Sequence, residues 1–526
     1  MSEFLTTESL VVGLVLVTTL VAIFARRRRL PYTVTLVVMG LLLAIPTEIE
    51  FEATPELILA IFVPPLIFEA AFHVELTRLR ENLRPILILA VPGVLLTTLL
   101  VGGMTALGAG MAFGTAVVFG ALIAATDPVA VVALFRALGV PRQLALTVEG
   151  ESLFNDGTAI VIFRIALVAA LTGVFDPVTG VVDFLRVALG GMVVGAVLGW
   201  ITAQLVARLE DRLIVTSLTT LLAFGSYVAA EYFHVSGVLA VVVAGLLCGN
   251  LGMAETQPST KIMIFNLWEY LAFLSNSLVF LLIGLSVDLT LLWENLPAIG
   301  VAVLAVVGSR AIVVYGFSGL ARLLRWGGQM PPSWRHVLFW GGLRGAISLA
   351  LALSLPAALQ ARAQLQAMTF GVVLFTLLAQ GTTIQYLLER LHLTERSPHW
   401  VEREMKLGRL FATQAGFSRL ERMHREGLLP DEMWIGLREG YREDQRQIAE
   451  DLTRLFREHA ELEGEMLFQA RREALRAERG ALWDALRRDY LSDSVSEKLS
   501  EEIDFRLEAL DLIYSETHEG EAAEGA

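Results

Sequence analysis

The chain contains 526 residues, of which 55% are hydrophobic and only 18% are charged, and its mean hydropathy is +0.61. This composition lies outside the range of soluble globular proteins and predicts a membrane protein in contact with the lipid bilayer. The formal net charge of −13 argues against a nucleic-acid partner, and the single cysteine, Cys248, excludes an intramolecular disulfide and a cysteine metal cluster.

The charged residues are concentrated toward the C-terminal end. Residues 395–526 hold 51 of the 95 aspartate, glutamate, lysine and arginine residues and carry −11 of the net charge. We therefore predict an apolar transmembrane domain over residues 1–394 and a charged tail over residues 395–526. Apolar residues of the tail recur at helical spacing from Ile448 and again from Val495, which predicts a helical tail.

Thirteen apolar segments of the first domain are long enough to cross about 30 Å of hydrocarbon as helices. They cover residues 8–25, 30–46, 54–73, 85–107, 112–137, 144–172, 181–207, 213–232, 235–250, 264–286, 296–324, 335–356 and 366–389. A basic loop follows every odd-numbered segment, as Arg26 to Arg29 follow the first, whereas the loop TEIEFEATPE after the second is acidic. Short cytoplasmic loops hold the excess of arginine and lysine, so we predict an external N-terminus and a cytoplasmic tail.

The fifth segment, residues 112–137, contains the sequence ATDPVAV. Pro128 has no N–H group, its ring clashes with the carbonyl four residues back, and it pushes Asp127 away from helical angles. We therefore predict a break in this helix at Thr126 and Asp127. A break at membrane depth is tolerated where the freed backbone lines a cavity, and discontinuous helices form ion sites in transporters in this way.

The sixth segment, residues 144–172, carries the polar sequence EGESLFNDG. A charge at the centre of a bilayer is costly, so ionisable residues there usually pair with each other, face a cavity or mark an ion path. Ser152 lies three residues before Asn155 and four before Asp156, so on a helix their oxygen atoms lie on one side. Such a cluster of oxygen atoms is what a small, hard cation requires.

The twelfth segment, residues 335–356, places Arg344 among three glycines in GGLRGAI. If the seventh segment is a linker, the six segments on either side form two repeats of opposite orientation, and the fifth and twelfth segments become equivalent discontinuous helices that cross. The alternative is that the glycines are packing contacts and that Arg344 balances a buried acid. We predict a structural ion pair between Arg344 and Glu151.

Four motifs together resemble a known family of transporters. FVPPLIFEAAF at 62–72, ATDPVAV at 125–131, GESLFND at 150–156 and GGLRGAISLALAL at 341–353 are similar to motifs of the monovalent cation:proton antiporter-1 family, the sodium/proton exchangers of the bacterial NhaP and animal NHE type. The resemblance covers about residues 8–390. It implies an all-α polytopic membrane protein of the cell membrane, a homodimer of chains with thirteen transmembrane helices in two inverted repeats, and exchange of one sodium ion for one proton.

The resemblance also implies roles for individual residues. Six positions match ion-binding residues of the family: Asp156, Asp127, Thr126, Ser152, Asn155 and Glu69. Asp156 matches the essential carboxylate, whereas Glu69 matches a more variable acidic position whose alternative role is an acid near the cavity mouth. Glu151 and Arg344 match a structural ion pair, and Arg310 is interpreted as a further structural arginine. The tail is expected to regulate transport, by analogy with the family alone.

The residue beside Asp156 bears on stoichiometry. With Asn155 in place of a second carboxylate, one titrating group accepts either one proton or one sodium ion, which predicts electroneutral exchange by alternating access. An unloaded Asp156 would be a bare carboxylate in a low dielectric, so the empty carrier is expected not to cross. Sodium, lithium and potassium all bind oxygen ligands, so a potassium/proton antiporter stays open as the alternative.

Two other classes of protein fit the sequence less well. A cation channel usually carries a filter sequence such as TVGYG, which is absent. A hydrolase of the G-x-S-x-G type would require a second glycine where GESLF has Phe154, and the chain has no Walker A loop, no dinucleotide fingerprint and no HExxH motif. We therefore expect neither an enzyme nor a bound cofactor, with the transported cation and proton as the substrates.

Overall fold

Helices make up nearly all of the described chain. The computed structural model describes residues 2–28, 32–44, 55–174, 176–209, 211–254, 256–285, 289–323, 331–391, 393, 398–488 and 490–524. Within these ranges there is no strand, which agrees with the predicted all-α fold class. The chain divides into two compact units, Met1–Glu395 and Arg396–Ala526, one residue from the predicted boundary.

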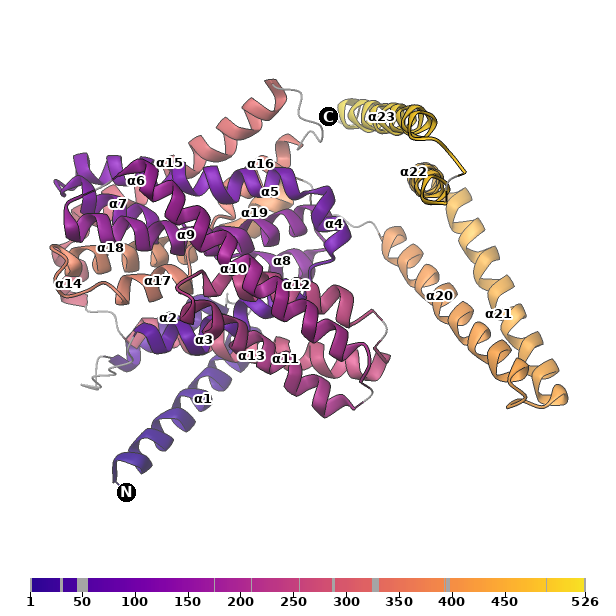
Figure 1. Ribbon diagram of the computed structural model, residues 1–526, viewed down its shortest axis with the longest axis horizontal. Coiled ribbons are helices and arrows are strands. Elements are labelled where there is room, and N and C mark those ends of the chain that lie inside the picture. The colour runs from indigo at the N-terminus through magenta and orange to yellow at the C-terminus, as the bar shows by residue number, and fades with distance from the viewer. Residues whose placement is uncertain are drawn as a thin grey trace. The chain divides into compact units, whose positions relative to one another are not determined.

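The helices of the first unit pack into two bundles (Figure 1). The first bundle consists of α1 (Ser2–Arg28), α2 (Tyr32–Ala44), α3 (Pro55–His73), α10 (Pro177–Val206), α11 (Arg212–Tyr232), α12 (Gly237–Leu247) with the π-helix η2 (Cys248–Gly252), and α13 (Pro258–Leu285). The second bundle consists of α5 (Leu83–Ile88), η1 (Leu89–Gly93), α6 (Val94–Gly108), α7 (Phe113–Leu122), α8 (Val129–Leu138), α9 (Arg142–Thr172), α14 (Leu289–Glu294), α15 (Leu296–Leu323), α16 (Pro332–Trp340), α17 (Ala346–Leu353), α18 (Arg362–Phe375), η3 (Thr376–Gln380) and α19 (Gly381–Arg390). The short helix α4 (Leu76–Glu81) links α3 to α5.

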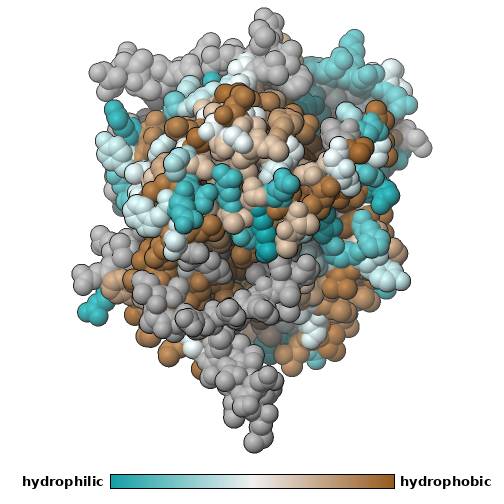
Figure 2. Space-filling model, turned by 90° about the vertical axis from the view of Figure 1, so that its left-hand side faces the viewer, coloured by the Kyte–Doolittle hydropathy of each residue, from teal (hydrophilic) through white to brown (hydrophobic). Residues whose placement is uncertain are grey.

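Every predicted apolar segment overlaps between one and three consecutive helices of these bundles. Among the described residues, seven helical stretches are long and apolar enough to cross a membrane, and five further apolar helices are shorter. Large apolar side chains are exposed on several helices, among them Leu107, Leu221 and Leu304, and apolar residues cover wide areas of the face in Figure 2. This surface suits lipid rather than water. The number of thirteen spans and the inverted repeats stay predictions.

Among the residues that the structure describes, the second unit contains four long helices, in agreement with the predicted helical tail. Helix α20 (Pro398–Arg425) packs against α21 (Asp431–Glu458), and α22 (Ala460–Arg487) packs against α23 (Asp493–Glu524). The ring of Trp434 is buried and stacks on the ring of His424, with 5.1 Å between the ring centroids. An ion pair of 2.9 Å between Arg479 and Asp504 joins α22 to α23.

The first predicted break is confirmed in the second bundle. Helix α7 ends at Leu122, α8 begins at Val129, and residues 125–128 between them are not helical. Pro128 cannot donate a backbone hydrogen bond, so a continuous helix through this position would lose one. The carbonyls of Ala124 and Thr126 are thereby left for partners outside the helix.

The second predicted break lies between α16 and α17 and crosses the first. Residues 342–345 are not helical. The backbone N–H of Asp127 donates a hydrogen bond of 2.8 Å to the carbonyl of Leu343, so the two broken segments are joined through their main chains. A Cβ atom on Gly345 would lie 2.0 Å from Asp127 Oδ2, so this close approach requires glycine.

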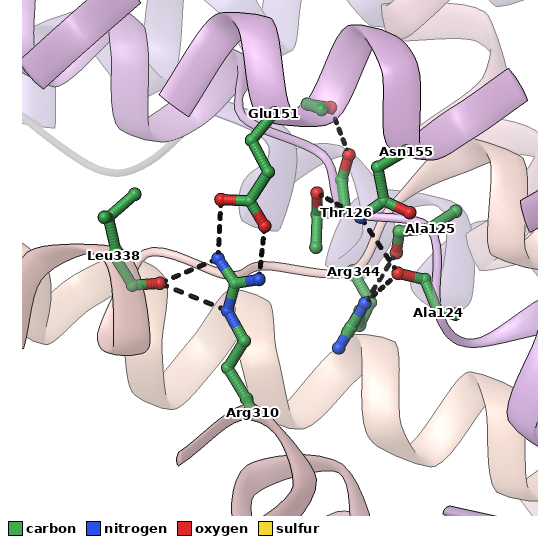
Figure 3. A network of polar contacts seen from close by, with 9 residues as sticks. Ala124, Ala125, Thr126, Glu151, Asn155, Arg310, Leu338 and Arg344 are labelled. Carbon is green, nitrogen blue, oxygen red and sulfur yellow. Dashed lines mark hydrogen bonds and ion pairs between the residues drawn. The ribbon is translucent and has the colours of Figure 1, made fainter. Parts of the chain in front are cut away.

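A buried ion pair fixes α9 against α15 (Figure 3). Both nitrogen atoms of the Arg310 fork contact the Glu151 carboxylate, with 3.0 Å between Nη2 and Oε2. The same guanidinium donates from Nε (3.2 Å) and Nη2 (2.9 Å) to the carbonyl of Leu338 near the end of α16. Glu151 is 2% exposed and Arg310 is 8% exposed. A buried ion pair is stabilising only when its geometry is good and its remaining N–H groups have acceptors. The Leu338 carbonyl supplies that acceptor for Arg310.

The predicted pairing of Glu151 with Arg344 is wrong. Arg344 is fully buried, and its Nη1 donates instead to the carbonyls of Ala124 (2.5 Å) and Ala125 (3.0 Å) (Figure 3). The physical reason is that the first break leaves these carbonyls without helical partners beside the unwound segment that carries Arg344. The planar fork of Arg310 is then the group that meets the carboxylate.

Two substitutions should separate the roles of these arginines. Arg310→Ala leaves Glu151 as an uncompensated buried charge, which should cost about 3–5 kcal/mol of stability. Glu151→Gln in the same chain removes that charge and should restore much of the loss. The same Glu151→Gln change should not rescue Arg344→Ala, because Arg344 contacts backbone carbonyls. Thermal unfolding of the purified protein in detergent measures all four variants. Rescue of Arg344→Ala but not of Arg310→Ala would contradict this assignment.

Candidate cation-binding site

A cavity lies where the two broken segments cross. Helices α3 and α13 of the first bundle line it, together with α9, α17 and the α7–α8 break of the second bundle. The lining includes seven residues with side-chain oxygen atoms: Thr126, Asp127, Glu149, Ser152, Asp156, Asn276 and Ser348. The structure therefore brings four of the six predicted ion-binding residues, Thr126, Asp127, Ser152 and Asp156, to one cavity, between the two bundles.

Asp156 is the buried acid of this cavity. It lies on α9 and is 9% exposed, and its Oδ1 atom has no hydrogen-bond partner among the described residues. A buried carboxylate oxygen without a donor is costly, so it calls for a proton or a cation. This atom is the strongest candidate for the centre of the site.

Asn155 and Ser152 hold the first break in place from the neighbouring helix. Asn155 Nδ2 donates to the carbonyl of Ala124 at 3.2 Å and to Thr126 Oγ1 at 3.1 Å, and Ser152 Oγ donates to the carbonyl of Thr126 (Figure 3). Asn155 is not among the cavity-lining residues, so its observed role is to position Thr126. The Thr126 carbonyl and the Ser152 hydroxyl remain adjacent oxygen atoms at the cavity.

The Asp127 carboxylate is engaged by a backbone group. Its Oδ1 atom accepts a hydrogen bond of 3.0 Å from the N–H of Val129 at the start of α8. The N-terminal ends of helices carry partial positive charge. Asp127 Oδ1 therefore has a backbone donor at the start of α8, whereas Asp156 Oδ1 has none among the described residues.

The structure does not place Glu69 at the cavity lining. Its Oε1 atom lies 3.4 Å from His73 Nδ1 on the same helix. Glu149 lines the cavity instead and forms a 3.0 Å ion pair with Arg136 of α8. Sequence reasoning did not assign Glu149 to the site, although it precedes Ser152 by three residues and Asp156 by seven, the spacing of one helical face.

Asn276 and Ser348 also line the cavity and were not predicted. Asn276 lies on α13, outside every motif that pointed to the site, so no local pattern indicated it. Ser348 follows the glycines of the second break. The predicted equivalence of the two broken helices could have indicated it, because ligands expected at the first break are then also expected at the second. Together with Asp156 and the Thr126 carbonyl, these residues bring hard oxygen atoms to a cavity whose lining also includes apolar side chains such as Leu66 and Ile67. Oxygen atoms of this kind suit a monovalent cation.

Comparisons with known proteins agree with the motifs. The family described as "Sodium/hydrogen exchanger, transmembrane" matches residues 14–390. The chain is 40% identical over 397 residues to the Na(+)/H(+) antiporter ApNhaP of Aphanothece halophytica, which covers 75% of each chain. It is 34% identical over 510 residues to the Na(+)/H(+) antiporter NhaS2 of Synechocystis, which covers 96% of this chain and 93% of that protein.

A solved structure has the same fold. The sodium proton antiporter MjNhaP1 from Methanocaldococcus jannaschii superposes with a TM-score of 0.64 at 22% identity, over 75% of this chain and all of that one. At this identity the likeness concerns the fold alone. The family match and the two closely aligned relatives confirm the resemblance of the motifs, and they show that this multi-pass membrane protein belongs to the sodium/hydrogen exchanger family.

Proposed function

We propose that this chain exchanges sodium or lithium ions for protons across the cell membrane, one for one, and that Asp156 carries either ion. The observation that supports this most strongly is the unpartnered Oδ1 atom of the buried Asp156 in a cavity lined by oxygen ligands. The relatives named as Na(+)/H(+) antiporters make sodium the first cation to test. A potassium/proton antiporter is the alternative, because potassium uses the same ligands.

The charges at the site favour electroneutral exchange. Asn155 supplies no second carboxylate next to Asp156, and the backbone N–H of Val129 at the start of α8 engages the Asp127 carboxylate. One group is then free to exchange a proton for a cation. The loaded site has the same net charge with either ion, and an empty site would expose a bare carboxylate to the low-dielectric interior.

The two bundles give alternating access a structural basis. The cavity is lined from both bundles, so a displacement of one bundle against the other would open it toward opposite sides of the membrane. Arg164 of α9 and Glu231 of α11 form an ion pair between the bundles, with 2.8 Å from Nη2 to Oε1 and 3.0 Å to Oε2. We propose that this contact breaks when the bundles move.

The membrane placement follows from the loops. Basic loops after the odd-numbered segments place the tail in the cytoplasm and the N-terminus outside, in the plasma membrane or the bacterial inner membrane. Membership of the family supports a homodimer and a role in pH homeostasis, and both are part of the proposal. The tail is proposed to regulate transport, since the cavity-lining residues all lie in the first unit.

The substitution Asp156→Asn should abolish exchange. The amide has nearly the same shape, so the protein should fold, but it binds no proton in the working pH range and cannot neutralise a cation. Sodium-driven proton movement in proteoliposomes between pH 6 and 9 measures this. In the wild type, lower pH should raise the apparent KM for sodium because the two ions compete, and high pH should slow turnover. Wild-type-like exchange by Asp156→Asn would refute the proposal.

A cross-link between the bundles should stop transport. Cys248 is buried and is the only cysteine, so a Cys248→Ala chain can carry the pair Arg164→Cys and Glu231→Cys. A short reducible bismaleimide should block exchange, and reduction should restore it. The control pair is Tyr315→Cys with His336→Cys, two residues of the second bundle whose side chains are 2.8 Å apart. Full exchange by the cross-linked Arg164 and Glu231 pair would exclude movement between the bundles.

A chain that ends at Ser397 should still exchange ions. The described ligands all lie before this position, so removal of the tail should change the rate or the pH profile rather than abolish transport. Exchange and oligomeric state are measured on the same preparation. Complete loss of exchange by a well-folded, dimeric truncation would show that the tail is required for the transport cycle.

A further inference from the structure

Ser348 has a buried hydroxyl group that lacks a hydrogen-bond partner. It is the third residue of α17, it is fully buried, and no donor or acceptor within the described residues contacts its Oγ atom. It also lines the cavity that contains Asp156. A buried hydroxyl without a partner is costly, and a ligand bound in the cavity would satisfy it.

This hydroxyl does not bond back to the carbonyls of its own helix. A helical serine or threonine usually donates to the carbonyl three or four residues earlier. Other residues of this chain do so, as Ser354 donates to Leu351 at 2.8 Å and Thr369 to Leu365 at 2.7 Å. For Ser348 the corresponding carbonyls belong to Arg344, in the non-helical segment, and to Gly345, which caps α17 and accepts a hydrogen bond of 3.4 Å from the N–H of Leu349. Ser348 Oγ donates to neither of them.

The free hydroxyl complements the free carboxylate of the site. Asp156 Oδ1 comes from α9 and Ser348 Oγ comes from α17, and both are buried, unpartnered oxygen atoms of one cavity. A hard cation in a protein takes several oxygen ligands from different directions. The predicted ligands Thr126, Asp127 and Ser152 all come from the first break and α9, so the second broken helix would otherwise contribute only through its backbone.

We propose that Ser348 Oγ is a further ligand of the transported cation, supplied by the second broken helix. This inference rests on the proposed function of the site. A proton needs only the Asp156 carboxylate, whereas a sodium ion needs a shell of oxygen atoms. Ser348 therefore contributes to cation binding selectively. Its removal weakens the binding of sodium more than the binding of the proton.

The test uses two variants and a matched control. Ser348→Ala removes the ligand, and Ser348→Cys keeps the side-chain size but replaces a hard oxygen by a soft sulfur, which is a poor ligand for sodium. Ser354→Ala is the control, because this serine lies next to the same helix, outside the cavity lining, with its hydroxyl bonded to Leu351. Exchange kinetics and sodium-dependent thermal stabilisation are measured on full-length protein.

Both Ser348 variants should raise the KM for sodium about tenfold, as expected for the loss of one interaction of roughly 1.4 kcal/mol. The sodium concentration for half-maximal stabilisation should rise equally, while the unfolding temperature without sodium stays near that of wild type. At a fixed sodium concentration the pH of maximal exchange should move upward, because protons compete more strongly. Ser354→Ala should change none of these values.

The possible failures are distinguishable. If the wild type moves no protons in response to sodium, the proposed function fails, and the inference falls with it. If the wild type exchanges and both Ser348 variants keep its sodium KM and sodium stabilisation, the inference alone is overturned. A lower unfolding temperature without sodium, with unchanged sodium affinity, would assign Ser348 a packing role and also overturn it.

Discussion

The site depends on how backbone groups freed by the two breaks are satisfied in an apolar environment. Unpaired carbonyls inside a membrane protein are costly unless other groups bond them. Arg344 and Asn155 bond the carbonyl of Ala124, and Ser152 bonds that of Thr126. The N–H of Asp127 bonds the carbonyl of the other broken segment. The same contacts that compensate for the first break also place its oxygen atoms beside Asp156.

This arrangement separates the two acids of the crossing. Asp127 accepts a hydrogen bond from a backbone N–H at the positively charged N-terminal end of α8. Asp156 keeps one oxygen atom without a donor in the same cavity. A transporter that exchanges one proton for one cation needs one carboxylate that either ion can neutralise, and Asp156 is that carboxylate in the proposal. The Glu151–Arg310 pair lies outside this exchange, because both of its charges are already compensated, and it serves to hold α9 against α15 and α16.

Local rules in the sequence predicted the breaks and the main ligands. Pro128 and the glycines around Arg344 act on their own backbone, and the spacing of Ser152, Asn155 and Asp156 follows from helical geometry. The partner of Glu151 could not be found in this way, because two buried arginines lie far away in sequence and the choice between them depends on packing. The direction of the Glu69 side chain could not be predicted for the same reason, since a carboxylate on α3 can face either the cavity or His73.

The central claim is that sodium and a proton occupy the same carboxylate in turn. Calorimetric titration of sodium into purified protein, in buffers that differ in ionisation enthalpy, counts the protons released for each sodium ion bound. The account predicts a value that approaches one at acidic pH and falls at alkaline pH, with no sodium binding by Asp156→Asn. Sodium binding that releases no protons at any pH, or that persists in Asp156→Asn, would contradict it.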